Sequence, residues 1–446
     1  MTINRLQDSS YAEILKILQE GTLQSQLSES SEMWNYVQKN LRKYAPDGKK
    51  LVRSLLTKRG FGAVGNIGYN GSFKAKKEAN FAELVAEAKF MTAHIEIPWS
   101  VYNAGKSDKG AFARPMAVEI EDKQTALAKV MTRQLMSDGS GILGKLTAIP
   151  TDNGTDGTFT ISSANGDRGC IRWIEINDEL EVVTSLADDT LITDFETGGA
   201  AAGNYLRVIS VDEDAGTFVA SGYTSSSSTG TFQAGSVAAN MFIVKRGAGF
   251  VDSGVTADFG DASLEMTGLE SLIDDSGLVH GLDRATVTTY KSGVVSAAGG
   301  LLATDHIQQA LTKANKLGDG KPSICVMSHN TYNRFVEIAE EDRRLVNTKD
   351  GTLGYERIGY SSYFGNVKFV VELYSRDDRI FLLDPKYLEL YGNDFSFFEE
   401  NGVTIRAATS SSGGYTPDYS SELIGTCEMF CCKPSAMARV ENYILS

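Results

Sequence analysis

The chain has 446 residues and a mass of 48.2 kDa, with 42% hydrophobic and 22% charged residues, which is ordinary for a globular protein. A chain of this length is usually too long to fold around one hydrophobic core, so two or three domains are expected. The net charge of −14 argues against nucleic-acid binding over the whole surface. No apolar run reaches membrane-spanning length and no apolar signal core opens the chain, so synthesis in the cytoplasm is expected.

The first 58 residues form a polar N-terminal segment. Four of its apolar residues recur at helical spacing: Met33, Trp34, Val37 and Leu41. Between residues 39 and 59 the otherwise acidic chain carries one acid, Asp47, and eight bases: Lys39, Arg42, Lys43, Lys49, Lys50, Arg53, Lys58 and Arg59. Such a cluster can neutralise nucleic-acid phosphates without reading sequence, or bond carboxylates of a neighbour, or simply solubilise an exposed surface.

Residues 60–72 contain five glycines but no lysine that completes a Walker-type motif, so a flexible or bulged β-hairpin is predicted here instead of a nucleotide site. Apolar and polar residues then alternate, which predicts a strand with one buried face made of Ile95, Ile97, Trp99 and Val101. His94 lies on the polar face of this strand, and a solvated histidine is favoured over a catalytic one.

The longest helical pattern runs from Ala111 to Met136, with Pro115 in its first turn. Its apolar stripe is Met116, Ile120, Leu127, Met131 and Leu135. The following SDGSGILG, residues 137–144, resembles a phosphate-binding loop in composition. Such loops need the N-terminus of a helix, whereas these glycines follow a C-terminus. We therefore predict a helix stop with Gly139 in the left-handed conformation.

Residues 146–250 change in character and become rich in Gly, Ser, Thr and Asp. Short β-type runs recur there, separated by turn residues: GTFTISS, CIRWIEI, LEVVT, YLRVISV, GTFVASG and NMFIVKR. This spacing predicts a small antiparallel barrel or sandwich, with a hairpin at VDEDAG. Residues 151–240 carry 14 acids and three bases, a net charge of −11, which favours placing this module away from any nucleic acid.

After residue 250 the pattern becomes mixed α and β. Asp305 and Gln308 resemble a capping box for a helix over 306–317 that Gly318 ends, and Asn330 is the predicted N-cap of the next helix. A structural role is expected for His329, which no nucleophile motif accompanies. Strands are predicted at SICVMS (323–328), NVKFVVELY (366–374), RIFLLD (379–384) and GVTIRAAT (402–409).

No catalytic, cofactor or metal motif is recognisable, so the sequence predicts no catalytic residues, no cofactor and no metal. A GxSxG elbow, HExxH, Walker A and a Rossmann fingerprint in strand-to-helix context are all missing. The five cysteines, Cys170, Cys325, Cys427, Cys431 and Cys432, form no CxxC pair. Buried reduced thiols are expected, and a disulfide between subunits is the alternative.

The order of segments resembles a tailed-phage major capsid protein with the HK-ninety-seven fold. Residues 60–101 are similar to the extended loop of that family, and 107–143 to its long spine helix with a D-G-x-G turn. TGLESLIDDSG, from Thr267, is similar to the element that directly follows this turn in simpler members, so the β-rich stretch resembles an insertion. Residues 323–340 and 427–443 are similar to a strand–helix step of the central A-domain and to the closing strand.

The resemblance implies an α+β fold: a long spine helix on a β-sheet, a mixed α/β A-domain and an extended β-hairpin loop, with an inserted antiparallel barrel or sandwich. The implied division is an N-terminal arm (1–58), an extended loop (59–104), a peripheral domain with the spine helix (105–145), the inserted β domain (146–250), the A-domain (251–380) and remaining strands of both domains (381–446).

The implied function is structural and non-enzymatic: self-assembly into pentamers and hexamers that form an icosahedral shell around viral double-stranded DNA, in the virion. The implied partners are copies of the chain itself, portal and scaffolding proteins, DNA bound without sequence specificity, and a candidate decoration protein, with no membrane. The alternatives are an encapsulin-type compartment shell, a carbohydrate-acting hydrolase whose carboxylates the sequence does not pair, and a surface adhesin.

Overall fold

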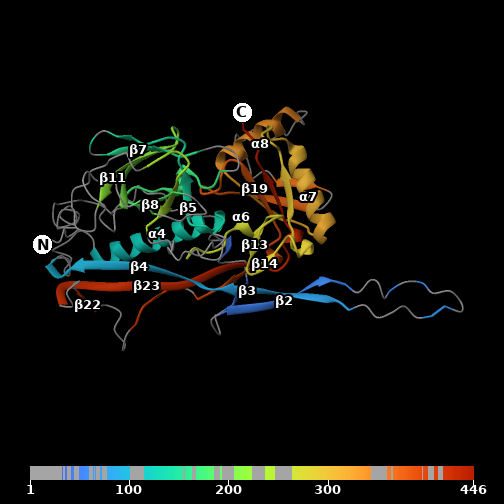
Figure 1. Cartoon of the computed structure of the whole chain (residues 1–446), viewed down its shortest axis with the longest axis horizontal. Helices are drawn as coiled ribbons and strands as arrows, with labels where there is room; N and C mark the ends of the chain where they lie inside the picture. The colour runs from blue at the N-terminus through green and yellow to red at the C-terminus, as the bar shows by residue number, and fades with distance from the viewer. Residues whose placement is uncertain are drawn as a thin grey trace, which may run out of the picture.

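The computed structural model describes residues 33, 36–37, 42–44, 50–59, 64, 66, 71–72, 78–100, 115–152, 154, 156–162, 167–184, 191–192, 205–223, 237–246, 264–342, 359–362, 365–393, 395–399, 406–409 and 415–445. A long sheet carries the helix α4 along the base of the molecule in Figure 1. A β-rich module (residues 142–246) and a mixed α/β unit lie above it, and a hairpin lies at one end of the base.

Helix α4 (Pro115–Met136) has 22 residues and is therefore ~33 Å long. The C-terminal part of the predicted apolar stripe faces the core, since Leu127, Met131 and Leu135 are at most 9% exposed, whereas Ile120 is only partly buried and the side chain of Met116 lies outside the described residues. Gly139 follows with φ of 80°, so the predicted left-handed turn is confirmed. The Asp138 carboxylate accepts the Ser140 N–H at 2.9 Å, which occupies an amide that a phosphate would need.

The long sheet is built around β23 (Tyr415–Cys431). Ten residue pairs join it antiparallel to β4 (Lys89–Pro98). Its other partners are β20 (Leu388–Tyr391), β21 (Ser396–Phe397) and β22 (Arg406–Thr409), and β1 (Arg42–Tyr44) adds to β20 in parallel.

The predicted buried face of β4 is only partly correct. Ile95 and Ile97 are at most 2% exposed, whereas Trp99 is half exposed, and Val101 lies outside the described residues. The chain leaves the strand after Pro98 and becomes helical at residues 99–100, so the alternation no longer places Trp99 on the sheet face. His94 is exposed, as predicted.

The mixed α/β unit contains a six-stranded sheet in the order β15-β24-β19-β16-β18-β17. Its strands are β15 (Gly293–Ser296), β16 (Ile324–Met327), β17 (Gly359–Ser362), β18 (Gly365–Val371), β19 (Arg379–Leu383) and β24 (Ala438–Glu441). Helices α7 (Thr304–Gly318) and α8 (His329–Asp342) accompany it. The predicted strands at 323–328, 366–374, 379–384 and 402–409 are confirmed where the structure describes them.

Three predicted helix ends are corrected. Helix α7 begins after Ala303, whose N–H is accepted by His306 Nδ1 at 3.2 Å, while Asp305 binds Gln309. Its left-handed end is Asp319, one residue beyond Gly318, with φ of 56°.

Helix α8 is capped by Ser328, whose Oγ accepts the Thr331 N–H at 3.2 Å, and not by Asn330. Asn330 donates instead to Asp377, at 3.1 Å. In both helices the N-cap lies two positions before the predicted capping residue, and Ala303 has the extended backbone that a cap requires.

The β-rich module is one antiparallel sheet in the order β5-β12-β8-β10-β11-β7-β6, with β9 beside β8. Its strands are β5 (Ile142–Lys145), β6 (Thr151–Asp152), β7 (Gly157–Thr160), β8 (Glu179–Val183), β9 (Leu191–Ile192), β10 (Tyr205–Asp212), β11 (Thr217–Tyr223) and β12 (Phe242–Lys245). The ends of β5 and β7 also meet, through the bonds Ser162 N to Lys145 O and Thr147 N to Thr160 O, so the path of strands returns to its start.

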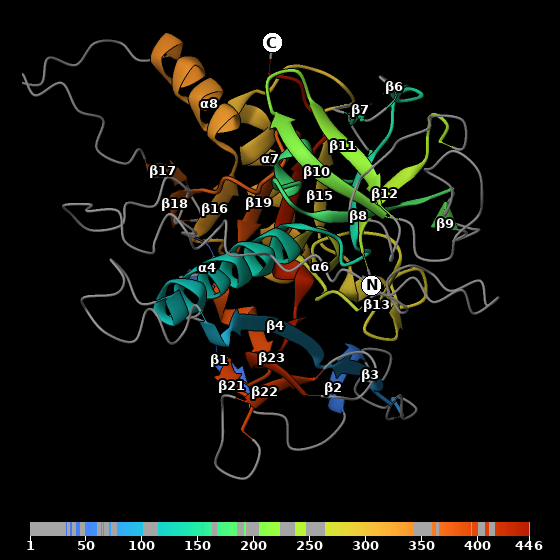
Figure 2. The same cartoon turned by 90° about the vertical axis from the view of Figure 1, so that its left-hand side faces the viewer.

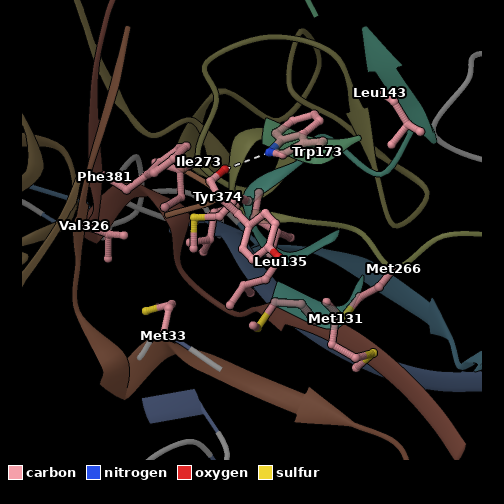
Figure 3. Close-up of a cluster of buried hydrophobic side chains, with 14 of the residues drawn as sticks. Met33, Met131, Leu135, Leu143, Trp173, Met266, Ile273, Val326, Tyr374 and Phe381 are labelled. Carbon is pink, nitrogen blue, oxygen red and sulfur yellow. Dashed lines mark hydrogen bonds between the residues drawn. The ribbon is translucent and has the colours of Figure 1, made fainter. Parts of the chain in front are cut away.

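One predicted strand of the module is wrong. CIRWIEI contains the 3₁₀ turn η2 (Ile171–Trp173) instead of a strand. The alternation of apolar and polar residues predicted a strand. In the structure Ile171, Trp173 and Ile174 are all buried, and Trp173 Nε1 donates to Tyr374 O at 2.8 Å (Figure 3). The turn serves the contact with the mixed α/β unit and not the sheet.

The two ends of the module lie close together, beside the end of α4. Arg133 pairs with Glu265 in a bidentate arrangement with both side chains at most 5% exposed. Gly268 lies against carbonyl groups of the last turn of α4, so closely that a Cβ would be 2.2 Å from Ser137 O. The short helix α6 (Leu269–Leu272) therefore follows α4 directly in space, although 132 positions separate Glu265 from Arg133.

A single apolar cluster joins the parts. Leu135 on α4, Trp173 in the module, and Val326 and Phe381 in the mixed sheet all belong to it (Figure 3). Met33 also belongs, at 1% exposed, and its N–H donates to Glu372 at 3.0 Å. Val37 is fully buried, which confirms helical spacing for these two residues, while Trp34 and Leu41 lie outside the described residues.

Candidate functional site

The hairpin of β2 (Lys50–Lys58) and β3 (Asn80–Glu87) lies at the base of the molecule, below β13 (Leu278–Val279) and β14 (Leu282–Asp283) (Figures 1 and 2). Leu56 and Phe81 are direct cross-strand partners and are 50% and 69% exposed. Val52, on the same face of β2, is 52% exposed. The hairpin therefore presents an apolar outer face, which we define as Val52, Leu56 and Phe81.

The inner face of the hairpin is anchored on the body. Leu84 and Ala86 are fully buried and belong to the main core. Arg53, on this face, pairs with the buried Glu389 of β20 at 2.8 Å, and its guanidinium carbon lies 5.7 Å from the centroid of the Phe430 ring. The body of the subunit thus covers the inner face of the hairpin but leaves Val52, Leu56 and Phe81 of the outer face at least half exposed.

Of the eight predicted basic residues, the structure describes the side chains of Lys50, Arg53, Lys58 and Arg59. Lys50 pairs with Glu87, and Arg53 is committed to Glu389, so both bond to carboxylates of the same chain. The side chains of Lys58 and Arg59 are exposed at the end of β2. Arg42 and Lys43 lie on β1, and the positions of their side chains, like the whole of Lys39 and Lys49, lie outside the described residues.

A buried polar pair that sequence reasoning missed lies at the root of the hairpin. Glu428 on β23 is 1% exposed, and its Oε1 accepts the Thr267 N–H at 3.1 Å. His280 Nε2 lies 3.9 Å from this oxygen and hydrogen-bonds Met429 O at 3.1 Å. The one available signal was a charged residue inside the apolar run TCEMFCC.

Burial moves the pKa of both groups away from the charged form. The pKa of Glu428 is raised to about 7, because desolvation outweighs the hydrogen bonds from Thr267 and the charge of Lys89. The pKa of His280 is lowered to about 4, again by desolvation above all. Both groups are therefore mostly neutral under mildly acidic conditions.

A second polar cluster fastens the β-rich module to the mixed α/β unit. Arg172 donates from both terminal nitrogens to the two carboxylate oxygens of Asp377, each at 3.0 Å. Arg172 also pairs with Glu213 inside the module. A cavity of about 650 Å³ lies beside this cluster, between the two parts of the chain.

All five cysteines are free thiols; Cys325, Cys427 and Cys431 are buried, as predicted for an apolar environment. Among the described residues, no group of three His, Cys, Asp or Glu side chains could hold a metal ion. In the same part of the chain, no helix has the length and apolar character that crossing a membrane requires.

Comparison with known proteins gives a family match and a fold match. Residues 248–407 match a family model described as SU10 major capsid protein. No curated protein matches the chain in sequence.

Among solved structures, a chain of the cyanophage A-1(L) capsid asymmetric unit is similar, with a TM-score of 0.54, 10% identity, and 98% of this chain and 99% of that chain covered. A chain from Mycobacterium phage Bobi has a TM-score of 0.43, 9% identity and 98% coverage of both chains. A chain of the SrpI encapsulin complex from Synechococcus elongatus PCC 7942 has a TM-score of 0.45, 7% identity, and 100% and 98% coverage.

The cyanophage likeness establishes the fold, and the family model covers the segment that contains most of the mixed α/β unit. The segments quoted from the sequence occur in the predicted order along this fold. These findings agree with the resemblance seen in the sequence: residues 248–407 match the SU10 major capsid protein model, and the chain has the fold of a phage capsid protein, the HK-ninety-seven fold.

Proposed function

We propose that the chain assembles with copies of itself into pentamers and hexamers, which close into an icosahedral shell around viral double-stranded DNA. The capsid fold and the family match over residues 248–407 support a shell protein. In this function the protein acts through its surfaces, so we propose no catalytic role. Its place would be the capsid of the virion, after synthesis in the host cytoplasm.

The observation that carries the proposal is the apolar outer face of the hairpin. Leu56 and Phe81 are cross-strand partners, and Val52 lies on the same face beyond the Ser54–Glu83 pair, each of the three at least 50% exposed. Large apolar side chains that stay exposed on one face of an element favour an interface. An element that covers a neighbouring copy makes a head-to-tail contact, which closes into a ring when the rotation allows it.

The test replaces one side chain of this face with a polar one. Phe81→Ser should leave the subunit folded and prevent it from forming closed particles, as observed by electron microscopy and light scattering. Ile209→Ser is the matched control, because Ile209 is 46% exposed on the β-rich module, away from the hairpin. Equal assembly by the Phe81 variant and the wild type would contradict the role of the hairpin face.

The contents of the particles distinguish two kinds of shell. Packaged DNA is expected for a virus capsid, whereas a protein cargo in place of DNA would indicate an encapsulin-type compartment. Portal, scaffolding and decoration proteins are further proposed partners of the capsid. Co-purification of the assembled particles with proteins from the same source would test these partnerships.

We propose that Lys58 and Arg59, with Arg42 and Lys43, contact DNA phosphates on the inner side of the shell, while the acidic module lies outside. The exposure of Lys58 and Arg59 supports this placement, whereas Lys50 and Arg53 already bond to carboxylates of their own chain. A map of the assembled shell tests it. Exposure of Lys58 and Arg59 on the outer surface, or of the acidic module on the inner one, would refute it.

A further inference from the structure

The carboxyl group of Glu428 has one oxygen with a partner and one without. Oε1 accepts the Thr267 N–H, whereas Oε2 is buried and has no hydrogen-bond partner. An ionised carboxylate in such a place would leave a full charge unsatisfied, which is costly inside a protein. A protonated acid fits the arrangement better, because its second oxygen then carries no net charge. The structure therefore matches the neutral form of Glu428.

Glu428 lines a cavity of about 310 Å³ where the hairpin joins the body. Such a volume can hold several water molecules, at ~30 Å³ each. Several elements bring titratable or charged side chains to its wall: Lys50 on β2, Glu87 on β3, Lys89 on β4, Asp138 after α4, and His280 in the turn between β13 (Leu278–Val279) and β14 (Leu282–Asp283). Tyr391, on β20, is the strand partner of Glu428.

The cavity also coincides with the pivot of the hairpin. Strand β3 ends at Glu87 and β4 begins at Lys89, so the chain changes sheets within two residues. Lys89 is the strand partner of Cys427, the residue next to Glu428. The Val85 N–H donates to His280 O at 3.0 Å and ties β3 to the turn. A change of charge at Glu428 therefore acts on the residues that set the direction of the hairpin.

We propose that Glu428 is a proton-operated switch that sets how firmly the hairpin is held at its root. When Glu428 is protonated, the hairpin keeps the position seen here. When Glu428 loses its proton, the carboxylate draws the Lys89 ammonium and water into the cavity, and the contact between Val85 and the turn weakens. This deepens the proposed function, since the hairpin carries the face that a neighbouring copy would cover.

His280, the other buried titratable group of the polar pair, responds to pH in a different range. Burial lowers the pKa of His280 to about 4, so this side chain is already neutral where Glu428, with a pKa raised to about 7, changes its charge. Lys50 and Glu87 pair with each other and offset each other's charge. Of the two buried groups of the polar pair, Glu428 is therefore the one that changes its charge near neutral pH.

The test is amide hydrogen exchange of the full chain in its unassembled state, from about pH 5 to about pH 9 and corrected for intrinsic rates. Peptides from residues 50–58 and 80–87 should exchange about tenfold faster above the transition than below it. Glu428→Gln, which keeps the neutral shape, should hold the slow rate throughout. Glu422→Gln is the control, because Glu422 is exposed on the same strand and should change nothing.

Infrared difference spectra of the wild type provide a second test, which does not depend on whether Glu428→Gln folds. The wild type should lose a carboxylic-acid carbonyl band over the same pH range in which the hairpin loosens. Lys89→Met should move both changes to higher pH, because it removes the cation that favours the ionised form. Hairpin exchange that is constant with pH in the wild type, or that still changes in a folded Glu428→Gln chain, would overturn the proposal. Because single chains are measured, a failure to form shells would not affect the result.

Discussion

Arg172 and Asp377 form a bidentate ion pair that connects the β-rich module to the mixed α/β unit, 205 positions apart in the chain. The arginine side chain is 9% exposed and the aspartate 39%. Asp377 also accepts hydrogen bonds from Ser328 Oγ at 2.5 Å and from Asn330 Nδ2 at 3.1 Å, at the start of α8. The module is thus fixed to the loop before β19 and to the cap of α8 by one carboxylate.

Removal of the charge from Arg172 should destabilise the subunit. Arg172→Met keeps most of the apolar stem but leaves Asp377 with only its neutral donors. We expect a loss of about 1–3 kcal/mol in the free energy of unfolding, since the pair is only partly buried. Denaturant unfolding of the purified chain measures it.

Arg168→Met is the matched control for this change. Arg168 pairs with Asp138 at 3.1 Å but is 42% exposed, so its loss should cost about 1 kcal/mol or less. If both variants lose the same stability, the Arg172 pair does not fasten the module more firmly than an ordinary surface contact.

Replacement of the β-rich module tests whether it is an insertion. Arg133 and Glu265, which lie before and after the module in the chain, are joined by an ion pair, so a short Gly/Ser linker can replace residues 141–263. We expect the remaining chain to fold with a lower Tm, because Tyr374 loses its contact with Trp173. Circular dichroism and thermal unfolding measure both effects. A wholly insoluble or unfolded product would show that the module is part of the main core.

Gly139 should be sensitive to substitution for two separable reasons. Its φ of 80° disfavours any side chain, and a Cβ would lie 3.1 Å from the Thr267 Cα. Gly139→Val should cost about 1–2 kcal/mol from the backbone conformation alone. Gly277 has a φ of 78° with no atom within 4 Å of a Cβ, so Gly277→Val measures the conformational part by itself. An equal loss at both sites would show that the contact with residue 267 is unimportant.

The raised pKa of Glu428 predicts a specific dependence of stability on pH. Between the ordinary carboxyl value of 4.5 and about 7, the folded chain holds this proton more tightly than the unfolded chain. The contribution of Glu428 is thus fully present at low pH and is lost as pH rises through about 7. The loss is of the order of 3 kcal/mol.

Thermal or denaturant unfolding of the wild type and Glu428→Gln across this range isolates the effect. The difference in stability between the two chains should shift in favour of the glutamine variant as pH rises. A constant difference would mean that Glu428 has the same proton affinity in the folded and unfolded chains.

Local patterns predicted the elements that depend on local sequence. The apolar stripe of α4, the glycine turn after it and the hairpin between β10 and β11 were all recognisable, because each depends on neighbouring residues. The fold was predicted from the order of these segments, which resembles the order in a known family. The domain boundaries drawn from that comparison stay predictions, and β5 lies before the predicted start of the inserted domain at residue 146.

The polar contacts could not be predicted in the same way. Arg53 and Glu389 are 336 positions apart, and nothing in either neighbourhood indicates the pairing. The same is true of Thr267 and Glu428, which meet only after α6 has packed against α4. The spacing of apolar residues around Trp173 also predicted a strand wrongly, because Trp173 is buried by contact with another part of the chain. Long-range packing decided each of these contacts.

Electron cryomicroscopy of the purified wild-type chain tests the central claim most directly. The account predicts closed shells in which Val52, Leu56 and Phe81 lie against a neighbouring copy. Single subunits at all concentrations, or shells in which this face of the hairpin is open to solvent, would contradict it.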